Sequence, residues 1–123
     1  MNAPDRTTSF LLDEEIDEKK ITAAPDLKIE NATLFTLNRE DHTIGNLLRM
    51  QLLRDPNVRF VGYMMPHPLI MSFDLKVQTN SNMVKPTASL VTSVEDLSGE
   101  VDHLNSAFDD ACKLYKASEQ GRK

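Results

Sequence analysis

The segment PTASLVTSVEDLSGEVDHLNSAFDDACKLYKA, residues 86–117, decides the fold of this chain. Its apolar side chains recur at alternating steps of four and three residues, which is the spacing of a helix with one apolar stripe. Pro86 suits the first turn of such a helix, because an N–H at that position would lack a partner within the helix. The pattern predicts one long helix, whose stripe is named here the heptad seam: Leu90, Val94, Leu97, Val101, Leu104, Phe108, Ala111 and Tyr115.

The predicted helix is too long to be covered by its own domain. At 1.5 Å per residue it spans roughly 48 Å, whereas a compact domain of this size has a radius of gyration of about 14 Å. The near end of the seam, Leu90 and Val94, is explained simply as the core-facing side of an amphipathic helix. From Leu104 onward the seam runs past any local core, and exposed apolar surface of this kind marks interfaces. We therefore expect a partner helix or a groove along the far end.

Three segments upstream of this helix predict the strands of an antiparallel sheet. Residues 31–37 form a short run rich in strand-favouring side chains. In residues 71–78 apolar and polar side chains alternate, the pattern of a strand with one dry face and one wet face. Residues 58–65, between these two segments, form the second strand in chain order, and its alternation places three apolar side chains on one side: Val58, Phe60 and Met64.

A shorter helix is predicted between the polar break at residues 38–42 and Pro56, with Asp41 or Thr43 as its N-terminal cap. One face of it is apolar at helical spacing, and Met50 and Leu53 widen that surface sideways. We therefore expect this helix to make two packing contacts, one with its own sheet and one elsewhere. The partner-binding residues predicted on the two helices are Ile44, Leu47, Leu48, Leu52, Leu90, Val94, Leu97, Val101, Leu104 and Phe108.

These elements predict the α+β class: a small antiparallel sheet backed by two helices, with the C-terminal helix long and extending into a dimer interface. A chain of 123 residues with 40% apolar residues fits one domain. Within residues 1–123 we expect an extended N-terminal arm (1–25), a folded core with the long helix (26–117) and a flexible tail (118–123). The arm is acidic and contains one apolar cluster, residues 10–12.

The charge of the chain argues against strong direct binding to nucleic acid. The formal net charge is -5 and the isoelectric point is near 5.1, and no local basic patch overcomes that repulsion. No stretch approaches the ~20 apolar residues that span a bilayer, and the N-terminus lacks the apolar run of a signal peptide. We therefore expect no membrane association and no secretion. The single cysteine, Cys112, cannot form an intramolecular disulfide and fits a reducing compartment.

The residues that could carry catalysis do not assemble into a recognisable site. His42 and His67 invite acid–base or metal chemistry, but His42 precedes a helix and His67 lies between two prolines, so a role in turns is the simpler interpretation. The carboxylate pairs of the long helix are adjacent in sequence and point in different directions. The four glycines form no phosphate-binding loop. We predict a non-catalytic protein that needs no metal and no cofactor.

The stretch EDHTIGNLLR, residues 40–49, closely resembles the signature of the small dimerising subunits of cellular RNA polymerases, a family that includes archaeal subunit L and the N-terminal domain of the bacterial alpha subunit. Further matches follow in the family's order and cover most of residues 1–79. In one departure, Met50 stands where bacterial relatives have a second arginine. After Thr79 only the pattern is similar. The matching segments are MNAPDR at 1–6, LLRDP at 52–56, FVGY at 60–63, PHPL at 66–69 and VQT at 77–79. The signature positions are Asp41, His42, Thr43, Gly45, Asn46, Arg49, Pro66, His67 and Pro68.

The resemblance implies both a partner and a place of action. The helices would pack on those of the third-largest polymerase subunit, and this heterodimer would be an early assembly platform to which the second-largest subunit and the core enzyme are added. Leu69 after Pro68 and the run Gln51-Leu52-Leu53 are most similar to the polymerase II form, which implies a nuclear protein of mRNA transcription. The alternatives are the equivalent subunit shared by polymerases I and III, a self-associating helical interaction module, and a small enzyme that uses the two histidines.

Overall fold

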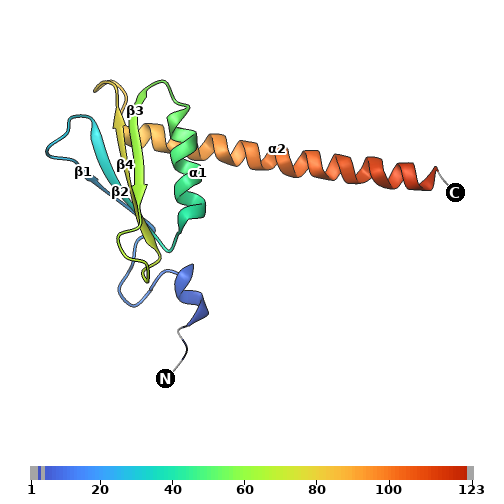
Figure 1. Ribbon diagram of the computed structural model, residues 1–123, viewed down its shortest axis with the longest axis horizontal. Coiled ribbons are helices and arrows are strands. Elements are labelled where there is room, and N and C mark those ends of the chain that lie inside the picture. The colour runs from blue at the N-terminus through green and yellow to red at the C-terminus, as the bar shows by residue number, and fades with distance from the viewer. Residues whose placement is uncertain (1–2, 4, 122–123) are drawn as a thin grey trace.

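The chain forms a four-stranded sheet with two helices on one face, and the second helix projects far beyond the sheet (Figure 1). The computed structural model describes residues 3 and 5–121. This architecture confirms the predicted α+β class. Among the described residues, no helix is both long enough and apolar enough to cross a membrane. The elements in chain order are η1 (Arg6–Ser9), β1 (Ile21–Pro25), β2 (Ala32–Asn38), α1 (His42–Leu53), β3 (Val58–Met64), β4 (Ser72–Thr79) and α2 (Pro86–Gln120).

The sheet is antiparallel throughout, with the strand order β1-β2-β4-β3. Strand β4 occupies an inner position, and there Leu75 pairs with Phe35 of β2 while Phe73 pairs with Leu37. Because side chains alternate across a strand, these four side chains lie on the same face of the sheet, under the helices. The alternation predicted for residues 71–78 is confirmed, since every second side chain of β4 is buried.

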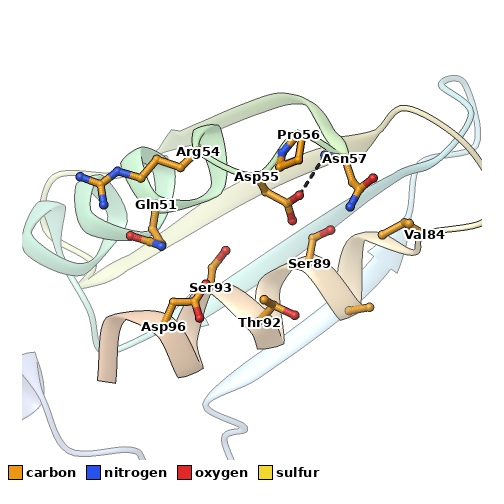
Figure 2. Close-up of a pocket in the computed structure, with 11 residues that line it drawn as sticks. Gln51, Arg54, Asp55, Pro56, Asn57, Val84, Ser89, Thr92, Ser93 and Asp96 are labelled. Carbon is orange, nitrogen blue, oxygen red and sulfur yellow. Dashed lines mark hydrogen bonds between the residues drawn. The ribbon is translucent and has the colours of Figure 1, made fainter. Parts of the chain in front are cut away.

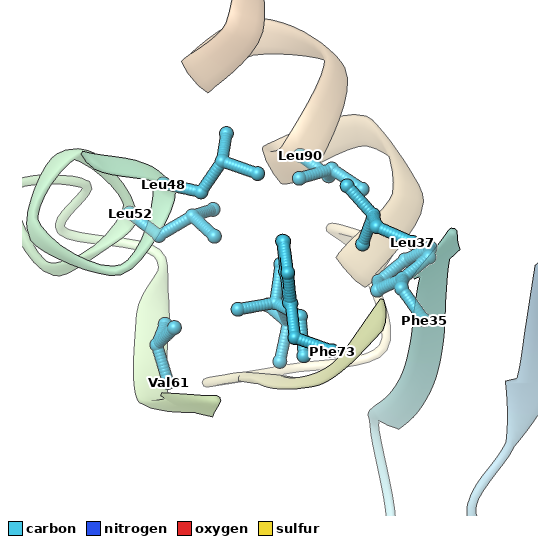
Figure 3. Packing of buried hydrophobic residues seen from close by; sticks show 9 residues of the cluster. Phe35, Leu37, Leu48, Leu52, Val61, Phe73 and Leu90 are labelled. Carbon is cyan, nitrogen blue, oxygen red and sulfur yellow. The ribbon is translucent and has the colours of Figure 1, made fainter. Parts of the chain in front are cut away.

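One hydrophobic core lies between the sheet and the two helices, as Figure 3 shows. Leu48 and Leu52 reach it from α1 and Leu90 reaches it from α2. Phe73 is fully buried at its centre, and the ring of Tyr63 packs edge-on against it with centroids 5.8 Å apart. Full burial of each such side chain contributes about 1.5–3 kcal/mol. The buried members of the core are Phe35, Leu37, Leu48, Leu52, Val61, Phe73, Leu75, Val77 and Leu90.

Strand β3 contains a β-bulge that changes which of its side chains face the core. The pairing register with β4 shifts between Val58 and Phe60. An extra residue in one strand moves the alternation by one position, so every side chain after it changes face. Val61 is buried as a result, whereas Phe60 and Met64 are 49% and 63% exposed. The prediction that Val58, Phe60 and Met64 share one side is therefore wrong.

The first strand of the sheet corrects the predicted N-terminal boundary. Residues 21–25 were expected to belong to an extended arm, but they form β1 and pair with β2 along their whole length. Two alanines and a proline give this strand a weak local signal, because those residues are depleted in strands. Its place at the edge of the sheet accommodates the proline, which cannot donate a hydrogen bond to a neighbouring strand.

The residues before β1 fold back onto the end of the sheet and are not extended. Residues 6–9 form the short helix η1, which is capped by Asp5, and a turn follows at residues 14–17. The side chain of Arg39, at the end of β2, donates hydrogen bonds to this segment at Thr8 and Glu18. Within the described residues, the segment that was predicted to be an extended arm is therefore folded.

Helix α2 begins at Pro86, as predicted, and continues to Gln120, beyond the predicted end at residue 117. Its 35 residues correspond to about 52 Å. Residues 118–120 of the predicted flexible tail are helical, and Gly121 is the C-cap. The remainder of that tail, residues 122–123, lies outside the described residues.

Candidate dimerisation interface

Helix α1 starts at the predicted cap. The side chain of Asp41 accepts a hydrogen bond of 2.9 Å from the backbone N–H of Thr43, which satisfies a donor that the helix itself leaves free. This bond is the main reason why the pKa of Asp41 lies below its usual value. The cap fixes the entry of α1 and thereby the direction in which its apolar side chains point.

The apolar surface of α1 is divided between the core and the exterior. Gly45, Leu48 and Leu52 are buried against the sheet. Leu47 and Met50 lie on the other side of the helix and are 47% and 52% exposed. The helix therefore does have apolar residues on two sides, and its own domain covers only one of them.

The first turns of α2 rest on the core through a narrow row of side chains. Ser89, Leu90 and Ser93 are buried, and Leu97 packs partly against the core. Successive helical residues are about 100° apart, so Val94 lies to the side of this row, where it is 45% exposed. The expectation that Leu90 faces the core is confirmed, and the same expectation for Val94 is wrong.

The distal half of α2 carries the heptad seam away from the domain (Figure 1). Leu104 and Phe108 are 66% and 70% exposed, and Val101 and Tyr115 are exposed as well. The Tyr115 hydroxyl donates to Glu119 one turn further along the same helix. Within the described part of the chain, α2 packs on α1, β2 and β4 through its first turns only, and the far half of the seam is left uncovered.

The predicted partner-binding residues thus separate into three groups. Leu48, Leu52 and Leu90 belong to the core, so they cannot face a partner and that part of the prediction is wrong. Ile44 and Leu97 are partly buried against the core. The exposed members, named here the open helical surface, are Leu47, Val94, Val101, Leu104 and Phe108.

A cleft of about 340 Å³ lies between the end of α1 and the first turns of α2 (Figure 2). The hydroxyl groups of Ser89 and Ser93 point from α2 toward α1, and the Ser89 hydroxyl has no hydrogen-bond partner among the described residues. Beside the cleft, Arg54 and Glu100 form an exposed ion pair at 3.3 Å, which contributes about 0–1 kcal/mol. The lining residues include no histidine, so neither serine hydroxyl has an imidazole of the lining beside it to act as a general base.

The signature residues at the start of α1 form a local structural cluster. His42 Nδ1 lies 2.9 Å from the Tyr63 hydroxyl oxygen, which ties α1 to β3. Gly45 faces the ring of Tyr63, and a Cβ at this position would lie only 2.7 Å from a ring carbon. On the outer side, the Arg49 guanidinium donates to the Asn46 side chain at 2.8 Å. The contacts with Tyr63 position α1, and sequence reasoning missed the central role of Tyr63 because that role depends on the bulge in β3.

The second histidine of the signature has a different environment. His67 lies in the exposed turn between Pro66 and Pro68, and its Nδ1 accepts a hydrogen bond of 3.1 Å from the Leu69 backbone N–H. Among the described residues, no hydrogen bond joins His67 to the His42–Tyr63 pair. Among the described residues, no group of three histidine, cysteine, aspartate or glutamate side chains could hold a metal ion.

A sheet covered on one face by two helices, with apolar side chains exposed along both helices, defines a dimerisation domain of the α+β class. Residues 32–107 match the family described as the RNA polymerase Rpb3/Rpb11 dimerisation domain. The chain belongs to this family.

Individual relatives agree with the family match. The chain is 49% identical to the probable DNA-directed RNA polymerase II subunit RPB11 of Caenorhabditis briggsae over 92% of its length and 89% of the relative's. It is 47% identical to DNA-directed RNA polymerase II subunit rpb11 of Dictyostelium discoideum, over 88% of either chain. The fold resembles the crystal structure of DNA-directed RNA polymerase subunit L from Thermoplasma acidophilum, with a TM-score of 0.64, 22% identity, and coverage of 80% of this chain and 96% of that one.

Proposed function

We propose that this chain is a non-catalytic subunit of DNA-dependent RNA polymerase II that pairs with the third-largest subunit through the open helical surface. The observation that carries the proposal is the uncovered far half of the heptad seam, with Leu104 at 66% and Phe108 at 70% exposure. The names of the relatives, polymerase II subunits of Caenorhabditis briggsae and Dictyostelium discoideum, supply the class of complex.

The energetics favour a partner that supplies apolar surface along α2. Covering a leucine or phenylalanine side chain completely contributes about 1.5–3 kcal/mol. Val101, Leu104 and Phe108 follow one another at steps of three and four residues, so one helix of a partner can reach all three. Leu47 of α1 extends the same kind of surface next to the domain. Pairing of helix on helix is therefore the contact that this surface favours.

The wider role follows from the pairing. The heterodimer would serve as the platform to which the second-largest subunit and then the core enzyme are added, and a nuclear location follows from membership in polymerase II. A net charge of -5 fits a subunit that reaches nucleic acid through its partners and not directly. The subunit shared by polymerases I and III is the second candidate, and a self-pairing helical module the third.

Co-expression with candidate partners tests this function. With the third-largest subunit of polymerase II from the same organism, we expect a stable one-to-one complex in size-exclusion chromatography with light scattering. The chain alone should self-associate or be poorly soluble, because the seam stays exposed. The control is the subunit of polymerases I and III that corresponds to the third-largest subunit of polymerase II. When both candidate partners are present together, this chain should bind less of the control subunit. A well-behaved monomer that ignores both subunits would contradict the proposal.

A further inference from the structure

The N-terminal segment carries a cavity of about 770 Å³ that the proposed pairing does not use. Its walls come mostly from residues 7–18, and Lys20 and Arg39 complete it. In Figure 1 this segment lies beyond one end of the sheet, whereas the loop into α2 lies at the other end. No residue of the heptad seam lines this cavity, which is named here the N-terminal cavity.

One arginine holds the cavity in shape. Arg39 Nε lies 3.0 Å from the Glu18 carboxylate, and its Nη1 donates to the backbone carbonyl of Thr8. The Arg39 and Glu18 side chains are only 22% and 17% exposed, so water screens this pair less than a pair on the open surface. The Asp13 backbone N–H, the larger cause, and Arg39 together hold the pKa of Glu18 below its usual value. The cavity is therefore preorganised.

Apolar side chains are exposed on its wall and beside it. Phe10 and Leu11 line the cavity and are 60% and 55% exposed. Ile16, in the adjacent turn, is 71% exposed. Neighbouring exposed apolar side chains of this kind are typical of protein interaction sites, and a phenylalanine can anchor a bound segment.

The charged groups around these side chains are acidic and available to a cation. Asp13, Glu14 and Glu15 line the cavity, and no lysine or arginine of the described residues lies within 4.0 Å of their carboxylate oxygens. The two cations of the lining, Lys20 and Arg39, are each already paired with another carboxylate. A positive side chain would therefore be attracted here and a phosphate would be repelled.

We propose that the N-terminal cavity binds a segment of another protein in which a lysine or arginine stands next to an apolar side chain. The apolar side chain would pack on Phe10 and Leu11, and the cation would lie among the carboxylates at residues 13–15. Charge complementarity favours such a segment over nucleic acid or an anionic lipid surface, because both of these present phosphates. The site is independent of the dimer interface and goes beyond the proposed function.

Three labelled peptides of equal length test the proposal by fluorescence anisotropy with the full chain in complex with its dimer partner. The first is an amphipathic peptide with lysine on its polar side and leucine and phenylalanine on its apolar side. The second replaces each lysine by glutamate, and the third replaces each apolar residue by serine. We expect only the first peptide to bind, with an affinity that falls as salt is raised. Equal binding of the first and second, or of the first and third, would overturn the proposal.

Variants of the chain locate the binding. Glu14→Lys with Glu15→Lys should weaken the lysine peptide about tenfold or more, and Phe10→Ser with Leu11→Ser should do the same. Arg39→Ala keeps every binding group and removes only the clamp, so a smaller loss is expected. All three should still form the one-to-one dimer, which separates this test from that of the proposed function. Unchanged affinity in both double variants would show that the cavity is not the site.

A photo-crosslinking residue in place of Phe10 identifies the natural occupant in the polymerase assembled in cells. Mass spectrometry of the crosslinked product should reveal a segment of another subunit or factor that combines lysine or arginine with apolar side chains. Crosslinks to an acidic segment, to nucleic acid, or only within this chain would contradict the proposal.

Discussion

The two halves of α2 carry one sequence pattern in two environments. The near half, up to Leu97, covers the sheet with Leu90 and two buried serines. The far half repeats the apolar spacing with Leu104 and Phe108, which nothing in the described part of the chain covers. Periodicity identifies the apolar side of a helix, whereas the length of the domain decides where that side stops being core.

Charge placed in the far half should have the largest effect on pairing. Leu104→Asp with Phe108→Asp would put two charges into a contact that excludes water, so we expect binding of the third-largest subunit to fall below detection in a pull-down. The domain should stay folded, because both side chains lie outside the core, and circular dichroism melts should be close to wild type.

The matched control puts equal charge on the opposite side of the same helix half. Helical spacing places Ser106 and Ala117 away from the seam, so Ser106→Asp with Ala117→Asp should pair normally. Wild-type binding by the seam variant, or equal loss in both variants, would refute the division of α2 proposed here.

Phe73 lies in the core beneath the near half of α2, and Phe73→Ala should lower the free energy of unfolding of the domain. Phe73 is fully buried, and truncation of a buried phenylalanine costs about 3–5 kcal/mol. Urea unfolding of the purified heterodimer should shift to a lower midpoint. A variant that melts like wild type yet fails to pair would place Phe73 at the interface and not in the core.

Gly45→Ala tests the contact that positions α1. The added methyl group would lie 2.7 Å from a carbon of the Tyr63 ring, and that ring is held by His42 and by Phe73. Overpacking of this kind costs about 1–3 kcal/mol. The loss should be partly recovered in Gly45→Ala with Tyr63→Leu, which removes the planar ring. Full stability in Gly45→Ala alone would mean that α1 shifts freely on the sheet.

Gly99→Ala, at the boundary between the halves of α2, should have the smallest effect. Unlike the substitutions above, it should stabilise the chain. A Cβ at this position meets nothing within 4 Å. Alanine is favoured over glycine inside a helix by about 0.5–1 kcal/mol, so helicity should rise slightly while pairing is unchanged. Weaker pairing would show that a partner approaches this face of the helix, opposite to expectation.

Much of the fold followed from local pattern. Strand β4 was predictable because one of its faces is dry and the other wet, and α1 because Asp41 caps it and Pro56 stops it. Strand β1 was not, because its residues have weak strand propensity and its pairing with β2 holds it in place. The facing of β3 was mispredicted because a bulge is set by pairing with the neighbouring strand, and a period of two cannot reveal an extra residue.

The candidate interface was predictable in outline but not residue by residue. The spacing of apolar residues predicted both the seam and a helix longer than its own domain can cover. Leu104 and Phe108 are exposed, as expected. Spacing does not tell which apolar residue of a helix points to its own sheet, so Leu48 and Leu52 were assigned to a partner although they are core. The folded N-terminal segment depends on Arg39, which lies far from it in sequence.

The position of α2 in the chain has a consequence for biosynthesis. Helix α2 follows all four strands and α1, so a ribosome makes the sheet before it makes the seam. The near half completes the core with Leu90, and the far half, which has no role in that core, emerges only afterwards. The apolar surface of the far half is therefore not available to neighbouring nascent chains while the domain is incomplete, and the order of translation itself limits premature association.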